Sequence, residues 1–367
     1  MLFYLALLCV IVILSVIIRP TRSERAKAAY VAVVFAMLVA VAACRSYTVG
    51  ADTEQFVRAY SRIGIEGASA FQIERYEVGF TALCLLLNQI TSNYQILLFV
   101  TAVITYVPIG YVIYRLSEDV ILSCYLFITL NIFTSYLNVM RQGMCIALVV
   151  LSLLCLAKRK NMGFVVCILA SSLFHAYSLI SLVLLPLSRI GFKVRHLLIY
   201  AIAAFIVIFA FNDVVMNAAR LVLGRDEVYR GMYMSSNYFG ALIQLAFIAV
   251  IALLVVNYLE IGKRGGLPAK GLVAAYQHAI MLWLLFQLAG MQAEIFGRLG
   301  YYFEISAILS IPYALKIAEP KERKLLLVIM CSIALAYFLV VGFARPEWQG
   351  VVPYVIDFSN IEALLGM

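Results

Sequence analysis

Long runs of apolar residues, separated by short polar connections, cover most of the chain. A helix that rises 1.5 Å per residue needs roughly 20 residues to cross a hydrocarbon core of about 30 Å. The runs that reach or approach this length are 2–18, 27–44, 94–114, 120–136, 140–157, 196–212, 239–257, 272–293, 299–316 and 325–343. The pattern therefore predicts an all-α polytopic membrane protein.

Composition supports this fold class and excludes soluble ones. Hydrophobic residues make up 65% of the 367 residues and charged residues only 13%, which leaves too little polar surface for a soluble domain. The net charge of +9 lies mostly in connections between helices, so it indicates helix orientation and not nucleic-acid binding. The eight cysteines show neither a CxxC nor a zinc-like spacing with histidine, so we interpret them as packing residues.

The basic connections orient the helices, because such loops stay on the cytoplasmic side. They lie at residues 19–27, 158–160, 189–195, 263–270 and 316–324. An even number of crossings must then separate Lys160 from Arg189. We therefore expect two short helices, at about 162–174 and 176–187, with a break near His175 on the outer face. The total is about 12 transmembrane helices.

One short apolar segment does not fit as a crossing. Residues 77–90 reach only about 21 Å as a helix, and a crossing here would invert the orientation of every later basic loop. We therefore expect this segment to be re-entrant within a single membrane domain, 1–343. Both termini are then extracytoplasmic, together with loops 45–76 and 213–238 and a tail at 344–367.

Polar residues at the head of the run 140–157 are the first candidates for function. Asn138, Arg141 and Gln142 stand three and four residues apart, so they would share one face of a continuous helix. An arginine near bilayer depth is costly and is usually kept for a function. Snorkelling to lipid headgroups is the alternative. We favour an anion-binding role, because lipid-facing amides beside the arginine would be costly too.

The first outer loop supplies a candidate base. Asp52, together with Ser46 and Thr48, would satisfy the free N–H groups of a helix running from about 53 to 62. Alternatively, Asp52 is a general base at the membrane surface, where partial burial raises the pKa of a carboxylate. Gly50 would allow the backbone to approach a ligand closely.

Three residues that open the segment 77–90 are candidates for substrate binding: Arg75, Tyr76 and Glu77. Two simpler interpretations stand beside this one. Arg75 and Glu77 would form a surface ion pair of little energetic value, or Glu77 would only interact favourably with the N-terminus of the helix.

The remaining candidates lie on three further segments. His175 stands at the expected outer break, either as a base or as an ordinary hydrogen-bonding residue. In loop 213–238, arginine forks match phosphate oxygens and tyrosine faces suit sugar rings, although an interfacial helix has a similar pattern. The candidates there are Arg225, Tyr229, Arg230 and Tyr233. Arg298 and Tyr302 mark the outer mouth of 299–316, with an internal pair to Glu304 as the alternative for the arginine.

Five motifs resemble those of the EpsG family, which are Wzy-like bacterial exopolysaccharide and capsule polymerases. They read YTVGADTEQF, RYEVGF, NVMRQGMCIAL, SLFHAYSLI and GRLGYYFEISAILSIPYAL. They occur in the family's order and spacing over about residues 1–320. The family's fourth motif is closer to FHxSA, whereas Ala176, Tyr177 and Ser178 follow His175 here.

The resemblance implies a multi-pass glycosyltransferase of GT-C-like architecture in the bacterial cytoplasmic membrane, with its active site facing outside. Such a polymerase joins oligosaccharide repeat units carried on undecaprenyl diphosphate. Donor and acceptor are therefore both polyprenyl-diphosphate-linked oligosaccharides. Membrane lipids surround the protein, and a chain-length regulator or a flippase of the same pathway is a further expected partner.

The implied chemistry assigns roles to the candidate residues. Arg141 and Arg298 would stabilise the leaving diphosphate. Arg75 and Arg230 would assist them. Either Asp52 or His175 would be the base, with Asp52 favoured. No DxD or other acidic metal-binding spacing appears in the sequence, so we expect no metal and no cofactor.

Three other functions stay open from the sequence. A lipid-linked oligosaccharide flippase would place its polar groups midway through the spans and would usually show an internal repeat; no repeat is visible here. A membrane acyltransferase that modifies the polysaccharide would use a buried histidine, for which His175 is the candidate. A structural scaffold is disfavoured, because it needs no polar groups at depth.

Overall fold

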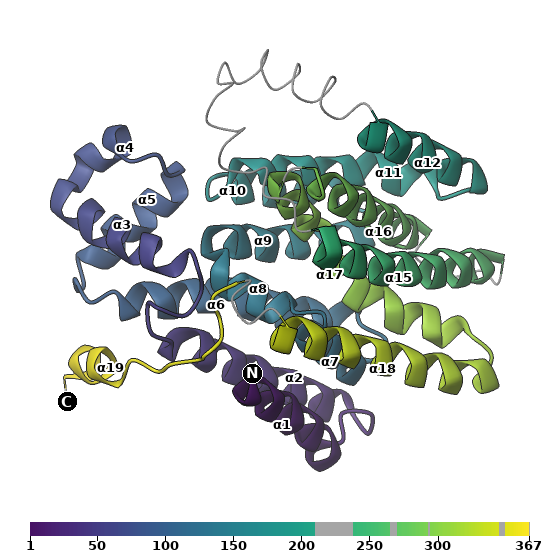
Figure 1. Ribbon diagram of the computed structural model, residues 1–367, viewed down its shortest axis with the longest axis horizontal. Helices are drawn as coiled ribbons and strands as arrows, with labels where there is room; N and C mark the ends of the chain where they lie inside the picture. Colours follow the sequence, from purple (N-terminus) through teal and green to yellow (C-terminus); the bar gives the residue numbers. More distant parts are fainter. Residues whose placement is uncertain (210–237, 265–269, 293, 345–348, 367) are drawn as a thin grey trace. The chain divides into compact units, whose positions relative to one another are not determined.

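The computed structural model describes residues 1–209, 238–264, 270–292, 294–344 and 349–366, and these residues are mainly helical (Figure 1). Across the described ranges there is no β-strand, and one isolated antiparallel bridge joins Arg45 and Ile356. The chain divides into two compact units, Met1–Leu179 with Val328–Met367 and Ile180–Leu327. Each unit is described by itself.

The first unit contains most of the helices that carry candidate residues. They are α1 (Leu2–Ile18), α2 (Glu24–Cys44), α3 (Thr53–Glu66), η1 (Gly67–Ser69), α4 (Ala70–Ile73), α5 (Val78–Asn88), α6 (Gln95–Leu116), α7 (Val120–Thr129), α8 (Ile132–Asn138), α9 (Met140–Ala157), α10 (Asn161–Ser172) and α19 (Phe358–Leu365). Helix α18 (Pro320–Ala344) ends in this unit, and the 3₁₀ helix η2 (Ala176–Val183) leaves it.

The core of the first unit is a layer of long apolar helices in which α6 packs between α2 and α9. Gly110 on α6 allows the close approach of α2, since a Cβ there would lie 2.6 Å from Cγ of Phe35. Side chains cap three helices of this unit: Ser23 accepts a hydrogen bond from Ala26 at the start of α2, Asp119 accepts two at the start of α7, and Asp357 accepts one from Asn360 at the start of α19. Such caps satisfy N–H groups that a helix start leaves unpaired.

The second unit is a smaller helical bundle. It contains α11 (Leu184–Ile190), α12 (Val194–Phe209), α15 (Tyr238–Arg264), α16 (Lys270–Gly290) and α17 (Glu294–Ile317). Helix α16 packs against each of the other four. Helix α17 carries the candidates Arg298 and Tyr302.

The helices confirm the predicted class of polytopic membrane protein. Within the described residues, six helices are long and apolar enough to cross a bilayer, or seven if α7 and α8 count as one bent span. The six lie in α2, α6, α9, α15, α16 and α18. Shorter apolar helices are α1, α5, α10, α12 and the pair η2–α11. The larger number of about 12 crossings stays a prediction.

Two predicted spans differ from the observed helices. The run 120–136 is not one helix, because α7 and α8 meet at a bend of 51°. The bend falls at Asn131, whose φ of 59° is left-handed, a conformation that asparagine tolerates better than most residues. The predicted break near His175 is confirmed, since α10 ends at Ser172. The helix expected at 176–187 instead begins as the 3₁₀ helix η2 and continues as α11.

Candidate active site

The site begins with a lobe made of α3, α4 and α5, which close into a ring in Figure 1. Helix α3 is amphipathic, and its apolar face packs on α5 through Phe56, Tyr60 and Phe80. The start of α9 joins the same hydrophobic cluster through Met140 and Met144. This packing brings the N-terminal ends of α5 and α9 together, although they are far apart in the sequence.

A break between α8 and α9 presents the polar residues of the NVMRQ motif. Asn138 is the last residue of α8, Val139 has non-helical dihedrals (φ −89°, ψ 61°), and α9 starts at Met140. The expectation that Asn138, Arg141 and Gln142 share one continuous helix face is therefore wrong. Arg141 stands in the first turn of α9 and is partly exposed, whereas Gln142 is buried.

Arg141 is held by a carboxylate and by aromatic rings. Its Nη1 forms an ion pair with Oε2 of Glu77, the residue before α5. Its guanidinium carbon lies 4.8 Å from the ring centre of Tyr76, 5.6 Å from that of Phe56 and 5.9 Å from that of Phe80. Cation–π contacts of this kind stabilise a charge that has lost part of its water.

The arginine keeps hydrogen-bonding capacity despite this support. Its Nε is buried and makes no hydrogen bond within the described part of the chain, and an unsatisfied buried donor of this kind is costly. The side chain of Arg141 is 20% exposed and that of Glu77 is 25% exposed. The exposed part of the guanidinium is suited to an anionic oxygen, whereas the buried Nε is closed to it.

Glu77 also fixes the turn that carries His175. Its second oxygen, Oε1, accepts a hydrogen bond from the backbone N–H of Ala176 at 3.3 Å. Next to it, the N–H of Gly79 donates to the carbonyl of Leu173 at 2.7 Å. The start of α5 is thus tied to the turn between α10 and η2, and Glu77 binds the backbone of the residue that follows His175.

The alternative of an Arg75–Glu77 surface pair is wrong. Glu77 pairs with Arg141, and Glu74 forms two hydrogen bonds with Arg62, at 2.7 and 3.2 Å. Arg75 is exposed on the lobe. The side chain of Tyr76 is partly buried against the cluster, and its hydroxyl accepts a hydrogen bond from Gln55 at 3.4 Å.

Asp52 is brought to the same place by the loop before α3. It occupies the N-cap position of α3, but its side chain makes no capping hydrogen bond, so the capping interpretation is wrong for it. The hydroxyls of Ser46 and Thr48 bond to each other at 3.1 Å and likewise cap no helix. Instead, the backbone N–H of Asp52 donates to Oδ1 of Asn138 at 2.8 Å.

Gly50 allows the backbone of the loop to approach the end of α8 closely, and its approach to a ligand stays a prediction. Its φ is 102°, and a Cβ would lie 2.9 Å from the carbonyl oxygen of Leu137 and 3.3 Å from Cα of Asn138. The loop therefore packs directly on the end of α8. One helical turn beyond Asp52, Phe56 contacts Arg141. Asp52, Asn138, Glu77, Arg141 and the His175 turn form one connected cluster.

The sequence analysis missed Arg45, a buried arginine that binds the end of α8 next to Asn138. It is 2% exposed and donates to the carbonyls of Ala42 and, at 3.2 Å, of Leu137. These carbonyls lie at the C-terminal ends of α2 and α8, where a positive charge is favourable. The signal in the sequence was an arginine directly after an apolar run, at the end assigned to the outside, where basic residues are uncommon.

The remaining predicted residues lie in the second unit or outside the described residues. Arg298 and Tyr302 lie on α17 in the second unit, where Tyr302 is buried and Arg298 is partly exposed. Their place beside Arg141 stays a prediction. The residues Arg225, Tyr229, Arg230 and Tyr233 fall outside the described residues. In the described part of the chain, no three His, Cys, Asp or Glu side chains are grouped so that they could hold a metal ion.

The family model for the EpsG family matches residues 28–356. The chain belongs to the EpsG family. Membership supports a Wzy-like polysaccharide polymerase that uses lipid-linked oligosaccharides, and the apolar helices make it a multi-pass membrane protein. No curated protein and no solved structure matches the chain.

Replacing Glu77 by glutamine is expected to slow polymer formation by about 30-fold, equivalent to about 2 kcal/mol for a hydrogen bond to a charged group. The variant keeps an oxygen for the Ala176 N–H but removes the counter-ion that orients Arg141. The rate of polymer formation per amount of folded protein measures the effect. Glu54→Gln is the matched control, since it breaks an exposed pair with Arg58 on α3; equal rates in both variants would contradict the assigned role of Glu77.

Proposed function

We propose that this protein polymerises oligosaccharide repeat units carried on undecaprenyl diphosphate, and that the cluster around Arg141 is its reaction site. One observation carries the proposal: a partly exposed arginine is held in place by Glu77 and three aromatic rings. Both candidate bases belong to segments tied to the same cluster. Membership of the EpsG family supports the substrate class.

The proposed step transfers a growing glycan between two lipid carriers. A sugar hydroxyl of the acceptor forms a bond to the anomeric carbon of the donor glycan, while the bond from this carbon to the diphosphate oxygen breaks. The hydroxyl proton passes to a base of the protein. The lipid diphosphate leaves with the electron pair of the broken bond, so negative charge grows on it as the reaction proceeds.

Arg141 stabilises this growing charge. Fixed positive groups at the leaving oxygens bind the transition state more strongly than the ground state, and only that difference accelerates the step. Glu77 and the rings hold the guanidinium in place before the substrate arrives, which avoids the cost of ordering it during the reaction. We assign Arg298 as the second diphosphate ligand, with Arg75 and Arg230 as further contacts to the substrate.

The base is Asp52 or His175, and we favour Asp52. The backbone of Asp52 is bound to Asn138, three residues before Arg141. The loop geometry therefore fixes the backbone of Asp52 relative to the segment that carries the arginine. His175 belongs to the turn between α10 and η2, which Glu77 binds through the N–H of Ala176. Its ring centre lies 5.3 Å from that of Tyr177.

The proposal includes the membrane arrangement predicted from charge. The chain crosses the bacterial cytoplasmic membrane about 12 times in a GT-C-like architecture, and the Arg141 cluster faces outside. Re-entry of the segment 77–90 as α5 suits this arrangement, because 11 residues in a helix are too few to cross. A chain-length regulator or a flippase of the same pathway is the further partner that we propose.

Polymer formation is expected to continue at an unchanged rate in the presence of a chelator, because arginines supply the positive charge that a divalent cation supplies in other transferases. The measurement is the rate of chain growth in washed membranes with and without EDTA. Loss of activity that added Mg²⁺ or Mn²⁺ restores would contradict this expectation.

The size of the glycan on the lipid carrier in cells tests the proposed function. Cells that lack the protein should accumulate single repeat units on the outer surface, and cells that express it should form long chains. Single units trapped on the cytoplasmic side would support a flippase. Long polymer of normal length without the protein would support a modifying enzyme, and either result would overturn the proposal.

A further inference from the structure

The C-terminal segment Gln349–Asp357, here termed the C-terminal strap, runs along the loop that carries Asp52. The backbone N–H of Ser46 donates to the carbonyl of Val355 at 2.9 Å. The N–H groups of Gly50 and Ala51 donate to the carbonyls of Gly350 and Gln349, at 2.8 and 2.9 Å. About 300 residues of sequence separate the two segments, yet the strap satisfies three backbone donors of the loop.

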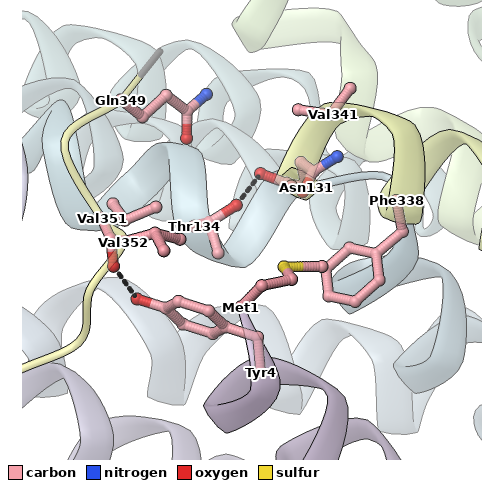
Figure 2. A pocket seen from close by; sticks show the side chains of 10 residues that line it. Met1, Tyr4, Asn131, Thr134, Phe338, Val341, Gln349, Val351 and Val352 are labelled. Carbon is pink, nitrogen blue, oxygen red and sulfur yellow. Dashed lines mark hydrogen bonds between the residues drawn. The ribbon is translucent and has the colours of Figure 1, made fainter. Parts of the chain in front are cut away.

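Tyrosine hydroxyls anchor the strap to helices on either side. Tyr4 on α1 donates to the carbonyl of Val351 at 3.0 Å, as Figure 2 shows. Tyr354 donates to the carbonyl of Val41 at 2.7 Å. Tyr94, at the start of α6, donates to the carboxylate of Asp357. The strap is therefore a fixed support for the loop.

Asp357 is ionised where it closes the strap. Burial raises the pKa of this carboxyl, but hydrogen bonds from Tyr94, Asn360 and Ser359 outweigh burial and leave the pKa below its usual range. A charged acceptor strengthens the bond from Tyr94. This end of the strap stays bound at neutral pH.

Gln349 is the residue through which the strap reaches the candidate site. Its carbonyl binds the N–H of Ala51, and its side-chain Nε2 donates to the hydroxyl of Ser135 on α8 at 2.7 Å. Three residues after Ser135, Asn138 binds the N–H of Asp52. Gln349 and Asn138 thus hold two successive amides of the loop, and both are tied to α8. Figure 2 shows Gln349 at the edge of a small cavity between the strap and α8.

We propose that Gln349 is a positioning residue that sets the distance between Asp52 and Arg141. The proposal rests on the proposed function, because the consequence of this distance is catalytic. The order of residues in the chain supports it. Only Val139 and Met140 separate the end of α8 from Arg141, and Ala51 directly precedes Asp52. Breaking the bond to Ser135 removes one of the bonds that hold the strap and the loop on α8, and so loosens the loop relative to the arginine while every helix stays intact.

The test compares variants that keep the backbone carbonyl of Gln349. Gln349→Met has a similar length but no donor, and it is expected to lower kcat about tenfold with little change in KM. Gln349→Glu is expected to restore most of kcat, because the Ser135 hydroxyl donates to a carboxylate. Ser135→Ala combined with Gln349→Met should be no slower than either single variant, since both remove one bond. Gln72→Met, exposed on α4, is the matched control.

Hydrogen exchange separates failure of this inference from failure of the proposed function. Faster exchange of the Gly50–Asp52 amides in Gln349→Met, with unchanged exchange in α6 and α9, is expected whether or not polymer forms. If the wild type forms no polymer in the assay, the proposed function fails and exchange alone decides the positioning. Three results would each overturn the inference. They are a kcat of Gln349→Met within twofold of the control, a double variant whose loss in kcat equals the product of the two single losses, and an unchanged exchange rate of the Gly50–Asp52 amides in Gln349→Met.

Discussion

Arg141→Ala is expected to abolish long polymer, with a loss of about 10² to 10³-fold in the rate of chain growth. This is the loss seen when one preorganised donor to a developing negative charge is removed. Here the loss includes the disordering of Glu77, whose partner disappears. The measurement is the length distribution of lipid-linked glycan, normalised to the amount of folded protein in the membrane.

Two further variants make this result specific. Arg141→Lys keeps the charge but loses the planar fork and its contacts with the rings of Tyr76, Phe56 and Phe80, so it should recover only part of the rate. Arg58→Ala removes an arginine of the same lobe whose side chain is 70% exposed in a surface pair. It should behave like the wild type, since such pairs contribute little. Normal chain lengths in Arg141→Ala would refute the assigned site.

Gly50→Ala is expected to reduce polymer formation at least tenfold. The added Cβ would lie 2.5 Å from the Thr53 hydroxyl, which can rotate, and 2.9 Å from the carbonyl oxygen of Leu137, which cannot. The loop must therefore move away from α8, and the bond from the Asp52 N–H to Asn138 is lost. The rate of chain growth and the exchange of the Asp52 amide report the two effects separately.

Gly67→Ala is the control that separates this clash from backbone strain. Gly67 also has a positive φ, 60°, but a Cβ there meets nothing within 4 Å. Both positions have a positive φ that alanine rarely adopts, so both variants carry backbone strain. Only Gly50→Ala should disturb the candidate site. Equal activity of the two variants would show that the approach of the loop to α8 has no role in the reaction.

The apolar pattern predicted the helices well because the length of a membrane-spanning helix is set by the bilayer. The predicted runs 2–18 and 140–157 coincide with α1 and α9. The break near His175 followed from the parity of basic loops, and α10 ends at Ser172, close to the expected end at about 174. The bend at Asn131 had a local signal that the pattern did not weigh, since asparagine favours left-handed conformations.

The pairing of residues in the site could not be predicted from local pattern. The break at Val139 contains no proline or glycine; tertiary contacts from Arg45 and Gly50 to Leu137 flank it. Glu77 and Arg141 are 64 residues apart, and only the packing of α3, α5 and α9 brings them together. The strap lies beyond the last motif used to interpret the sequence. Its backbone hydrogen bonds to the loop therefore could not be predicted from any sequence pattern.

The most direct test of the central claim is reconstitution of the purified protein in proteoliposomes with synthetic undecaprenyl-diphosphate-linked repeat units. The proposed reaction predicts a ladder of lipid-linked oligomers, with one undecaprenyl diphosphate released for each bond formed, and formation of both products about 10² to 10³-fold more slowly with Arg141→Ala. Repeat units that cross the bilayer without growing in length, or oligomers formed at the same rate by Arg141→Ala, would contradict it.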